Sequence, residues 1–226
     1  MQNKVIVITG AFGALGQALV TAALDRGATV AALDHASAGP VDVRAHILGG
    51  VDLTEPASAQ AAIDAVIARH GRLDVLLNAV GGFVWQTTMG GAPDAWSRMH
   101  QLNVATVLNA CRAALPALIA SGDGRIVNVG AFAALDAATG MGAYAAAKSG
   151  VHRLTEALAH EVQTRGVTVN AVLPTILDTP ANRADMPDAD PSVWVTPQAL
   201  ADIMLFLAGD QARAITGALI PVRGGL

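Results

Sequence analysis

Apolar runs typical of buried β-strands alternate with alanine-rich helical stretches along the whole chain. The expected strands cover residues 4–9, 29–33, 47–51, 75–78, 125–129, 167–172 and 218–222. We expect the longer segments between them to form crossover helices, at residues 14–26, 56–70, 93–119, 143–165 and 200–207. Because strands joined by such helices run parallel, the pattern predicts a single-domain α/β Rossmann fold over residues 1–226. It should contain a doubly wound, mostly parallel seven-stranded sheet with helices on both faces.

The composition restricts the possible partners. Hydrophobic residues make up 53% of the chain and charged residues 14%, which favours elements buried on more than one side, as in a covered sheet or an oligomer. The net charge of -4 comes without a basic block, so we expect no nucleic-acid partner. No uncharged apolar run reaches the roughly 18 residues of a spanning helix, and we expect no membrane partner. The first residues pass directly into a strand, which predicts a cytoplasmic protein.

One segment breaks the alternation of strands and helices. Residues 179–196 contain three prolines and several aspartates and have no long apolar run. We expect this segment to form an exposed, lid-like substrate loop. The only cysteine, Cys111, lies in an apolar helical stretch and is expected to be a buried small hydrophobe.

A glycine-rich turn follows the first expected strand and precedes an amphipathic helix. The turn contains Gly10, Ala11, Phe12, Gly13, Ala14, Leu15 and Gly16. Residues without bulk allow the backbone to approach a pyrophosphate closely, and the helix N-terminus offers amide donors and a positive dipole end. A turn of this kind alone is weak support, but its position between strand and helix predicts a dinucleotide-binding site.

Asp34 ends the second expected strand, about 20 residues after the turn, where a carboxylate can accept both ribose hydroxyls of an adenosine. The same carboxylate would repel a 2′-phosphate, which predicts NAD(H) as the preferred cofactor. His35 and Arg44 lie near in the sequence, so NADP(H) is not excluded. The alternative reading is that Asp34 is an ordinary turn residue.

Polar and small residues also follow the third and fourth expected strands. Asp52 and Leu53 follow one strand, and the stretch Asn78, Ala79, Val80, Gly81 and Gly82 follows the other. In open α/β sheets ligands bind beyond the carboxyl ends of the strands. We therefore expect Asp52 to reach an adenine amine and the two glycines to let the backbone approach the adenosine ribose.

Tyr144 is the only tyrosine in the chain, and it lies four residues before Lys148 in a strongly helix-forming stretch. This spacing places both side chains on one helix face. A phenol is a weak acid at neutral pH, and an adjacent ammonium favours its ionised form, so we expect Lys148 to lower the Tyr144 pKa. The pair predicts acid–base chemistry beside the dinucleotide, although such pairs also occur incidentally on helix surfaces.

These motifs together resemble the short-chain dehydrogenase/reductase family, over essentially the whole length of the chain. The resemblance implies that Tyr144 donates or accepts a proton and that Lys148 lowers its pKa and holds the nicotinamide ribose. It also implies that Asn103 orders a proton-relay water. Pro174, Ile176 and Thr179 match the segment that grips the nicotinamide carboxamide.

The chain departs from the family pattern at one position. The family's usual serine, which binds a substrate carbonyl, should lie thirteen residues before Tyr144, where this sequence has Ala131. The donor that would stabilise a developing alkoxide is therefore missing. Thr139, in the following loop, is an alternative donor.

Within the family, the segments around Ala131, Met141, His152, Thr179 and Trp194 resemble dihydropteridine reductases, which also lack the serine. Those enzymes reduce a flat conjugated ring, which accepts hydride without forming a localised alkoxide. Phe83 and Trp85 resemble their aromatic-bearing loop. We expect Ala131, Phe83, Trp85 and Trp194 to contact the substrate, with ordinary packing as the alternative for the tryptophans.

The six histidines show no metal-ligand spacing, so we expect no metal site. We expect Tyr144 and Lys148 to occupy the cofactor-facing stripe of their helix, which predicts His152 and His160 at an interface or on the surface. The alanine-rich remainder of that helix suits packing against another copy of the chain, and we expect a homo-oligomer, a dimer or tetramer.

The leading functional prediction is an NAD(H)-dependent oxidoreductase that transfers hydride to a small, pterin-like conjugated substrate, with Tyr144 and Lys148 handling the proton. The first alternative is a general carbonyl reductase or alcohol dehydrogenase, similar to 3-oxoacyl reductases. The second is a catalytically idle NAD-binding protein.

Overall fold

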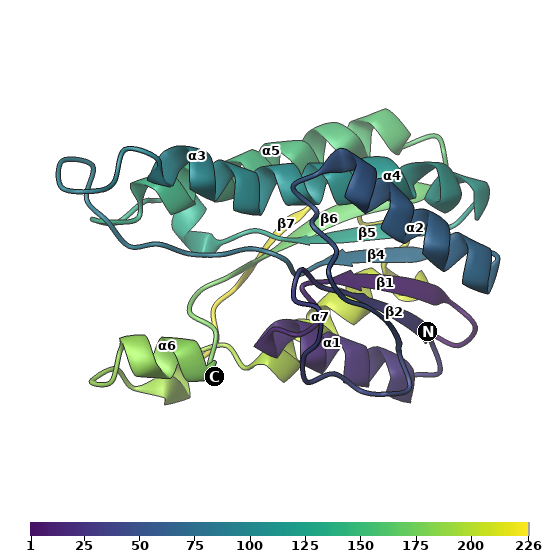
Figure 1. Ribbon diagram of the computed structural model, residues 1–226, viewed down its shortest axis with the longest axis horizontal. Helices are drawn as coiled ribbons and strands as arrows, with labels where there is room; N and C mark the ends of the chain where they lie inside the picture. Colours follow the sequence, from purple (N-terminus) through teal and green to yellow (C-terminus); the bar gives the residue numbers. More distant parts are fainter. Residues whose placement is uncertain (226) are drawn as a thin grey trace.

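The computed structural model describes residues 1–225 and consists of one parallel seven-stranded sheet covered by helices on both faces (Figure 1). The strand order is β3-β2-β1-β4-β5-β6-β7. The strands are β1 (Val5–Thr9), β2 (Thr29–Leu33), β3 (His46–Leu48), β4 (Val75–Asn78), β5 (Gly124–Val129), β6 (Val167–Pro174) and β7 (Leu219–Val222). All pairings in the sheet are parallel, which confirms the predicted Rossmann fold.

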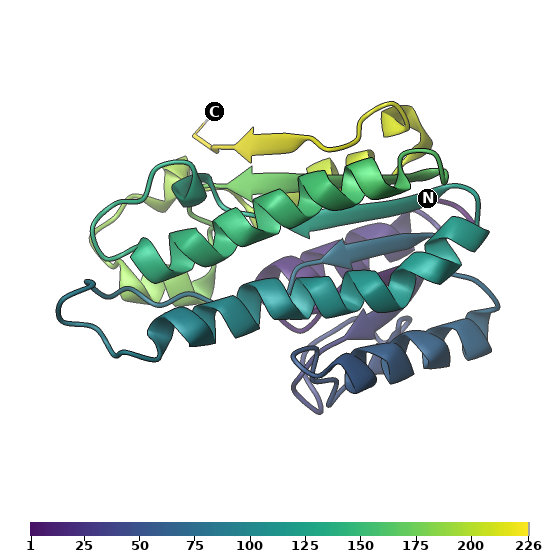
Figure 2. The ribbon, with the colours of Figure 1, turned by 90° about the horizontal axis from the view of Figure 1, so that it is seen from above.

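The helices divide between the two faces of the sheet, as Figures 1 and 2 show. On one face α1 (Ala14–Asp25) packs against α7 (Pro197–Leu207) over an apolar core that includes Ile6, Ile8 and Leu77. The other face is covered by α2 (Pro56–His70), α4 (Thr106–Ala120) and α5 (Gly142–Val162), over a core that includes Val7, Leu76 and Ile126. Alternate residues of each buried strand enter opposite cores, so the central strands read as continuous apolar runs.

The third strand has the largest boundary error among the expected strands. It was expected at residues 47–51, and the structure places it at His46–Leu48. Gly50 adopts a positive φ of 74°, and a Cβ on Gly49 would lie 2.3 Å from the Ser37 carbonyl oxygen. The chain therefore leaves the sheet through a glycine turn after Leu48, because only glycine fits both positions.

The long helical segment expected at residues 93–119 is a continuous run of three elements. It starts with α3 (Ala95–His100), passes through the π-helix η1 (Gln101–Ala105) and continues as α4. Residues Ala95–Ala120 are long and apolar enough to pass a test for a membrane span, but half of the tested window is buried inside the protein. A core helix passes the same test, so this result is weak support for a span.

The segment 179–196 is more ordered than the expected loop. It contains the short helix α6 (Pro180–Asp185) and the 3₁₀ turn η3 (Pro191–Val193), and a bridge between Leu177 and Val195 closes its base. The Thr179 hydroxyl accepts a hydrogen bond from the Asn182 amide and caps α6. In Figure 1, α6 stands apart from the other helices, beyond the carboxyl ends of the strands.

Candidate active site

A groove of about 470 Å³ opens at the carboxyl edge of the sheet, where the strand order reverses between β1 and β4. Such a reversal is the point at which open α/β sheets bind their ligands. The groove is lined by Gly10, Phe12, Gly13, Asp34, His35, Val51, Asp52, Leu53, Thr54, Ala79, Val80, Gly81, Leu102 and Thr106. The structure therefore brings half of the residues expected to bind the cofactor to one place.

The glycine-rich turn is shaped by two close approaches. Gly10 has a φ of +65°, and a Cβ there would lie 2.9 Å from the Val80 backbone. At Gly16 a Cβ would lie 2.1 Å from the Gly10 carbonyl oxygen. Only glycine allows helix α1 to start this close beneath the turn. Leu15 is buried in the core below it, so its side chain supports the turn instead of facing the groove.

The Asp34 carboxylate is fixed by two backbone amides. Its Oδ2 accepts from the Phe12 amide at 2.9 Å and its Oδ1 from the Ala36 amide at 3.0 Å. These bonds hold the carboxylate at the end of β2, beside the glycine-rich turn, and leave lone pairs on each oxygen for further donors. A pair of ribose hydroxyls would be suitable donors.

The Asp52 carboxylate is held in the same groove by Thr54. Its Oδ1 accepts from the Thr54 amide at 2.9 Å and from the Thr54 hydroxyl at 2.7 Å. The hydrogen bonds from Thr54 lower the pKa of Asp52, with nearby His35 as a smaller contribution. This carboxylate is therefore ionised and oriented at neutral pH.

Asn78 differs from the expected cofactor contact, because its side chain is fully buried inside the sheet. Its Nδ2 donates to Asn128 Oδ1 at 2.9 Å, and its Oδ1 accepts from the Thr9 hydroxyl at 3.3 Å. Asn128 in turn donates to Thr155 on α5. The groove itself is lined by the next residues, Ala79 to Gly81. Asn78 thus joins the strands beneath the groove.

Tyr144 and Lys148 lie in the first two turns of α5, and Lys148 reaches the end of β5. The Lys148 Nζ is buried, donates to the Val129 carbonyl at 2.8 Å and lies 6.0 Å from the centre of the Tyr144 ring. A Cβ on Gly81 would lie 3.2 Å from the same Nζ, so the lysine reaches the groove beside the β4 loop. Tyr144 is partly buried and packs against Met99, Ala143 and Ala147.

The pKa values of Tyr144 and Lys148 differ from those expected from the sequence. Burial raises the pKa of Tyr144 to about 12, and burial lowers the pKa of Lys148 to about 8. The expected lowering of the tyrosine pKa is absent, because desolvation of the phenolate outweighs the attraction of an ammonium 6.0 Å from the ring centre. Tyr144 is therefore a neutral proton donor at physiological pH.

Asn103 is fully buried in the π-helix η1, and its side chain binds backbone on both sides. Its Nδ2 donates to the carbonyls of Gly82 and Met99, each at 3.0 Å, and its Oδ1 accepts from the Gly82 amide at 3.2 Å. The side chain therefore fastens the loop after β4 to the helix. These bonds use both Nδ2 hydrogens but only one lone pair of Oδ1, so the side chain can still accept a hydrogen bond from a water at Oδ1. π-helical turns of this kind occur at functional sites.

Ala131, at the position of the missing serine, is 3% exposed and adopts an extended backbone after β5. Its amide donates to His152 Nε2 at 3.3 Å. The prediction that His152 lies at an interface or on the surface is wrong, because this residue is 2% exposed within the single chain and lies on the same inward stripe as Lys148. His160, on the outer side of α5, is exposed. Thr139 is exposed in the loop before α5.

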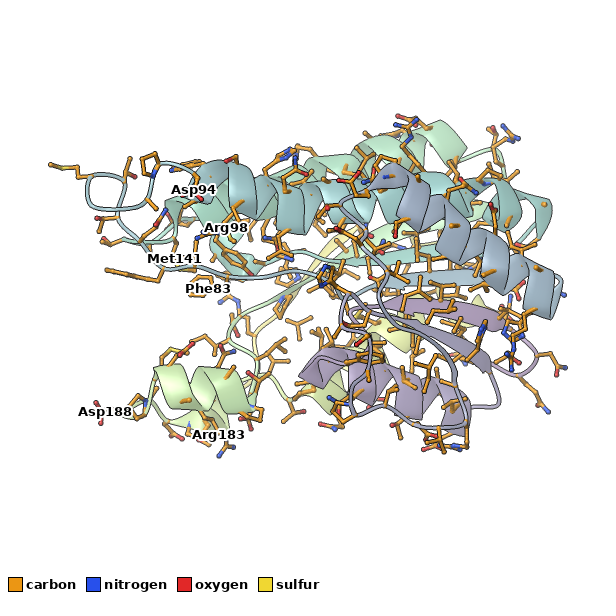
Figure 3. The ribbon with its side chains drawn as sticks, viewed as in Figure 1. Phe83, Asp94, Arg98, Met141, Arg183 and Asp188 are labelled. Atoms are coloured by element: carbon orange, nitrogen blue, oxygen red, sulfur yellow. The ribbon has the colours of Figure 1, made fainter. Side chains whose placement is uncertain are left out.

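An aromatic surface borders Tyr144. The Phe83 ring meets the Tyr144 ring edge to face, with centroids 5.0 Å apart and an interplanar angle of 86°. Trp85 lies against Gly140, where a Cβ would come 2.2 Å from the indole, and the Gln86 amide donates to the Gly140 carbonyl at 2.9 Å. Phe83 and Trp85 are more than half exposed. In Figure 3, Phe83 and Met141 lie under the α3 and α5 layer, on the side toward α6.

Four further residues stand apart from this surface. Trp194 is 6% exposed, in agreement with the packing alternative, and its backbone lies against Gly224. Pro174 is buried at the end of β6, whereas Ile176 is exposed just beyond it. Thr179 uses its hydroxyl to cap α6.

Cys111 is buried, and burial raises its pKa to about 12, so the thiol is unreactive. Within residues 1–225, no three potential metal ligands gather.

The known proteins that the chain resembles agree with this geometry. The short chain dehydrogenase family profile matches residues 4–190. The chain is 28% identical to 3-oxoacyl-(acyl-carrier-protein) reductase FabG of Salmonella typhimurium, with 100% of this chain and 98% of FabG covered. It is 33% identical to 2-(S)-hydroxypropyl-CoM dehydrogenase 3 of Xanthobacter autotrophicus, with 100% and 97% covered. The NADH complex of 3-ketoacyl-(acyl-carrier-protein) reductase from Brucella melitensis superimposes with a TM-score of 0.88 at 28% identity, covering 99% of this chain and 98% of that one.

The parallel sheet and the groove at its switch point are typical of a dinucleotide-binding Rossmann fold, and the matched family and its reductases and dehydrogenases make the protein an oxidoreductase. The chain belongs to the short chain dehydrogenase family. The matched relatives bear the names of 3-oxoacyl reductases and dehydrogenases, so the narrower resemblance to dihydropteridine reductases stays a prediction.

Proposed function

We propose that this protein reduces a flat, conjugated acceptor with NADH, and that a quinonoid dihydropterin is the type of substrate. The observation that carries this proposal is Ala131, whose methyl group stands where a carbonyl-binding serine is expected and whose amide is already bound to His152. A substrate that forms a localised alkoxide would find no hydroxyl at this position. A conjugated ring spreads the developing charge and needs such a donor less.

The groove fits a dinucleotide by shape and by charge. The approach of Gly10 to Val80 and of Gly16 to the Gly10 carbonyl forms a backbone cradle that side chains would fill. The glycine-rich turn and the start of α1 would hold the pyrophosphate, Asp34 the adenosine ribose, and Asp52 the adenine. Val80, Gly81 and Lys148 would hold the nicotinamide half, with Ile176 and Thr179 on the lid side. The Asp34 carboxylate favours NADH over NADPH, because it would repel a 2′-phosphate.

In the proposed reaction, bound NADH supplies a hydride and with it both electrons. Tyr144 donates the phenolic proton to the acceptor atom at which negative charge develops. Burial keeps this proton on the phenol until transfer, since the pKa of Tyr144 is about 12. The Lys148 ammonium stabilises the phenolate that remains, and a proton from solvent restores the phenol. Phe83 and Trp85 offer exposed ring faces for the acceptor, and residues 179–196 cover it as a lid.

A panel of acceptors separates the candidate functions. Purified protein should oxidise NADH when quinonoid dihydropterin is added. Turnover of ketones alone, above all of 3-oxoacyl thioesters, would replace the proposal with the carbonyl reductase that the relatives' names favour. Binding of NADH without turnover of any acceptor would indicate a catalytically idle protein.

Replacing Ala131 by serine should restore the donor of the family pattern. We expect Ala131→Ser to raise kcat/KM for simple ketones by about tenfold or more, because an oxyanion donor in its optimal position contributes about 100-fold or more. Activity on the conjugated acceptor should change little. Steady-state NADH oxidation measures both, with Ala133→Ser, two residues further along the turn, as the matched control. An unchanged ketone rate would mean that Ala131 does not face the reacting oxygen.

The pKa of Lys148 predicts the alkaline limb of activity. Burial lowers this pKa from 10.5 to about 8, so the ammonium is lost as the pH rises through about 8, while Tyr144 stays protonated. Reduction should therefore be level near neutral pH and fall by about tenfold per pH unit above this value. The pH profile of kcat/KM for the acceptor tests the assignment. A level profile up to about pH 10 would show that the Lys148 charge is not required.

We also propose that the protein is a cytoplasmic homo-oligomer, a dimer or tetramer. A shallow apolar groove on α4, bordered by Leu115, Pro116 and Ile119 and flanked by Arg112 and Arg165, supports burial of this surface by another copy. Light scattering of the purified protein gives its mass directly, and a monomer at micromolar concentration would contradict the proposal.

A further inference from the structure

The proposed reaction gives no role to His152, a buried ionisable residue of α5. Tyr144, Lys148 and His152 follow one another at intervals of four residues and form one inward stripe of the helix. Lys148 binds the Val129 carbonyl at 2.8 Å, and His152 Nε2 accepts from the Ala131 amide at 3.3 Å. The helix that carries Tyr144 thus holds the end of β5 at two points, one on either side of Gly130.

The residue between these two bonds is adapted to the imidazole. A Cβ on Gly130 would lie 2.4 Å from His152 Nε2 and 2.7 Å from its Cδ2, so the ring rests directly on the glycine backbone. The Gly130 amide donates to the Val172 carbonyl at 2.9 Å. Residues 129–131 therefore have their position set by β6 on one side and by α5 on the other, with no side chain between the strand and the ring.

The ionisation state of His152 suits an acceptor. Burial, with smaller contributions from the charges of Arg153 and Lys148, lowers the pKa of His152 to about 4. The ring is neutral at physiological pH, and a neutral imidazole that accepts at Nε2 carries its proton on Nδ1. A protonated ring could not accept the Ala131 amide, and it would place a second positive charge one helical turn from Lys148.

We propose that His152 is a positioning residue that fixes the turn after β5, and with it Ala131, relative to Tyr144 and Lys148. Without an acceptor, the buried Ala131 amide would lose its partner and the turn would shift toward another one. Shifts of about 1 Å at a reacting centre can reduce turnover by up to about 100-fold. The inference rests on the proposed roles of Tyr144 and Lys148.

The tautomer of His152 tests the contact without any substrate. Long-range ¹H–¹⁵N correlation spectra of wild-type protein at about pH 7 should show an unprotonated Nε2 and a protonated Nδ1 for His152, assigned by its loss in His152→Gln. A protonated Nε2 would overturn the proposal, because the Ala131 amide would then have no acceptor on this ring. Failure of the pterin proposal would leave this result unchanged.

Two variants test the consequence for turnover, with whichever acceptor the wild type reduces. His152→Leu removes the acceptor, and we expect kcat to fall about tenfold or more while KM for NADH stays within about twofold. His152→Gln keeps an acceptor oxygen and should retain kcat within about threefold of wild type. His160→Gln, on the exposed side of the same helix, should behave as wild type.

The comparison between the variants separates positioning from simple structural support. Equal loss of kcat in His152→Leu and His152→Gln, or no loss in either, would overturn the proposal, as would a loss confined to KM for NADH. If His152→Leu does not fold, the tautomer of the wild type and the kcat of His152→Gln still decide it, since the glutamine variant must keep its activity.

Discussion

Replacing Tyr144 by phenylalanine should abolish most turnover while NADH still binds. The substitution removes only the hydroxyl, and Phe can keep the edge-to-face contact with the Phe83 ring, whose centroid lies 5.0 Å from that of Tyr144. Tyr144 is the one tyrosine of the chain, so no second phenol can replace it. General acid catalysis contributes about 100-fold to 10,000-fold, and we expect a fall in kcat of this size.

Two measurements are needed, an activity assay and a binding titration. Steady-state NADH oxidation gives kcat, and quenching of protein fluorescence by NADH gives Kd, which should stay within about threefold of wild type. Phe132→Leu, a replacement in the neighbouring turn that removes no hydroxyl, is the control. If Tyr144→Phe retained wild-type turnover, Tyr144 would not be the acid, and the proposed reaction would lose its proton donor.

The second large effect is expected at Asp34. Its carboxylate is fixed by the Phe12 and Ala36 amides at the end of β2, where it can accept the two ribose hydroxyls. Asp34→Ala removes these acceptors and the repulsion of a 2′-phosphate at the same time. Two charge-assisted hydrogen bonds contribute about 1.5–3 kcal/mol each, so we expect kcat/KM for NADH to fall by at least tenfold.

The preference for NADH over NADPH should narrow in the same variant, because the penalty for the 2′-phosphate disappears. The ratio of kcat/KM for the two cofactors is the relevant quantity. Asp64→Ala, an exposed aspartate on α2, is the matched control and should leave the ratio unchanged. An unchanged ratio in Asp34→Ala would show that the adenosine ribose does not lie against this carboxylate.

Much of the fold can be predicted because its signals are local. The alternation of apolar strands and alanine-rich helices fixes the order of elements, and the helix at Pro56–His70 was predicted with the observed bounds. The error at β3 has a cause that apolarity does not reveal. Val51 continues the hydrophobic run, but the chain has already turned at Gly49 and Gly50.

Some of the site residues could likewise be predicted from the sequence, and others could not. Gly10, Gly13, Asp34 and Asp52 follow strands at fixed spacings, and the structure collects them in one groove. Asn78 belongs to the same pattern, yet its side chain serves the interior of the sheet. Sequence position indicates the edge of the sheet but not whether a side chain points into it or out of it.

Two features of α5 show what the sequence could and could not provide. His152 could have been placed inward, because it lies four residues after Lys148 and eight after Tyr144, on the same stripe. The pKa values of Tyr144 and Lys148 could not be predicted from the sequence, because they depend on burial. The Lys148 ammonium is expected from the sequence to dominate, but desolvation raises the Tyr144 pKa to about 12. The π-helix that contains Asn103 likewise has no signature in the local sequence.

In the proposed reaction Tyr144 works without a second hydroxyl, so the protein favours an acceptor that forms no localised alkoxide. The most direct test is the ratio of kcat/KM for quinonoid dihydropterin to that for a saturated cyclic ketone, both measured with the wild-type protein and NADH. An oxyanion donor contributes about 100-fold or more to carbonyl chemistry, and we expect the ratio to exceed about 100. A ratio of about one or below would contradict the account and identify the protein as a carbonyl reductase that lacks the usual serine.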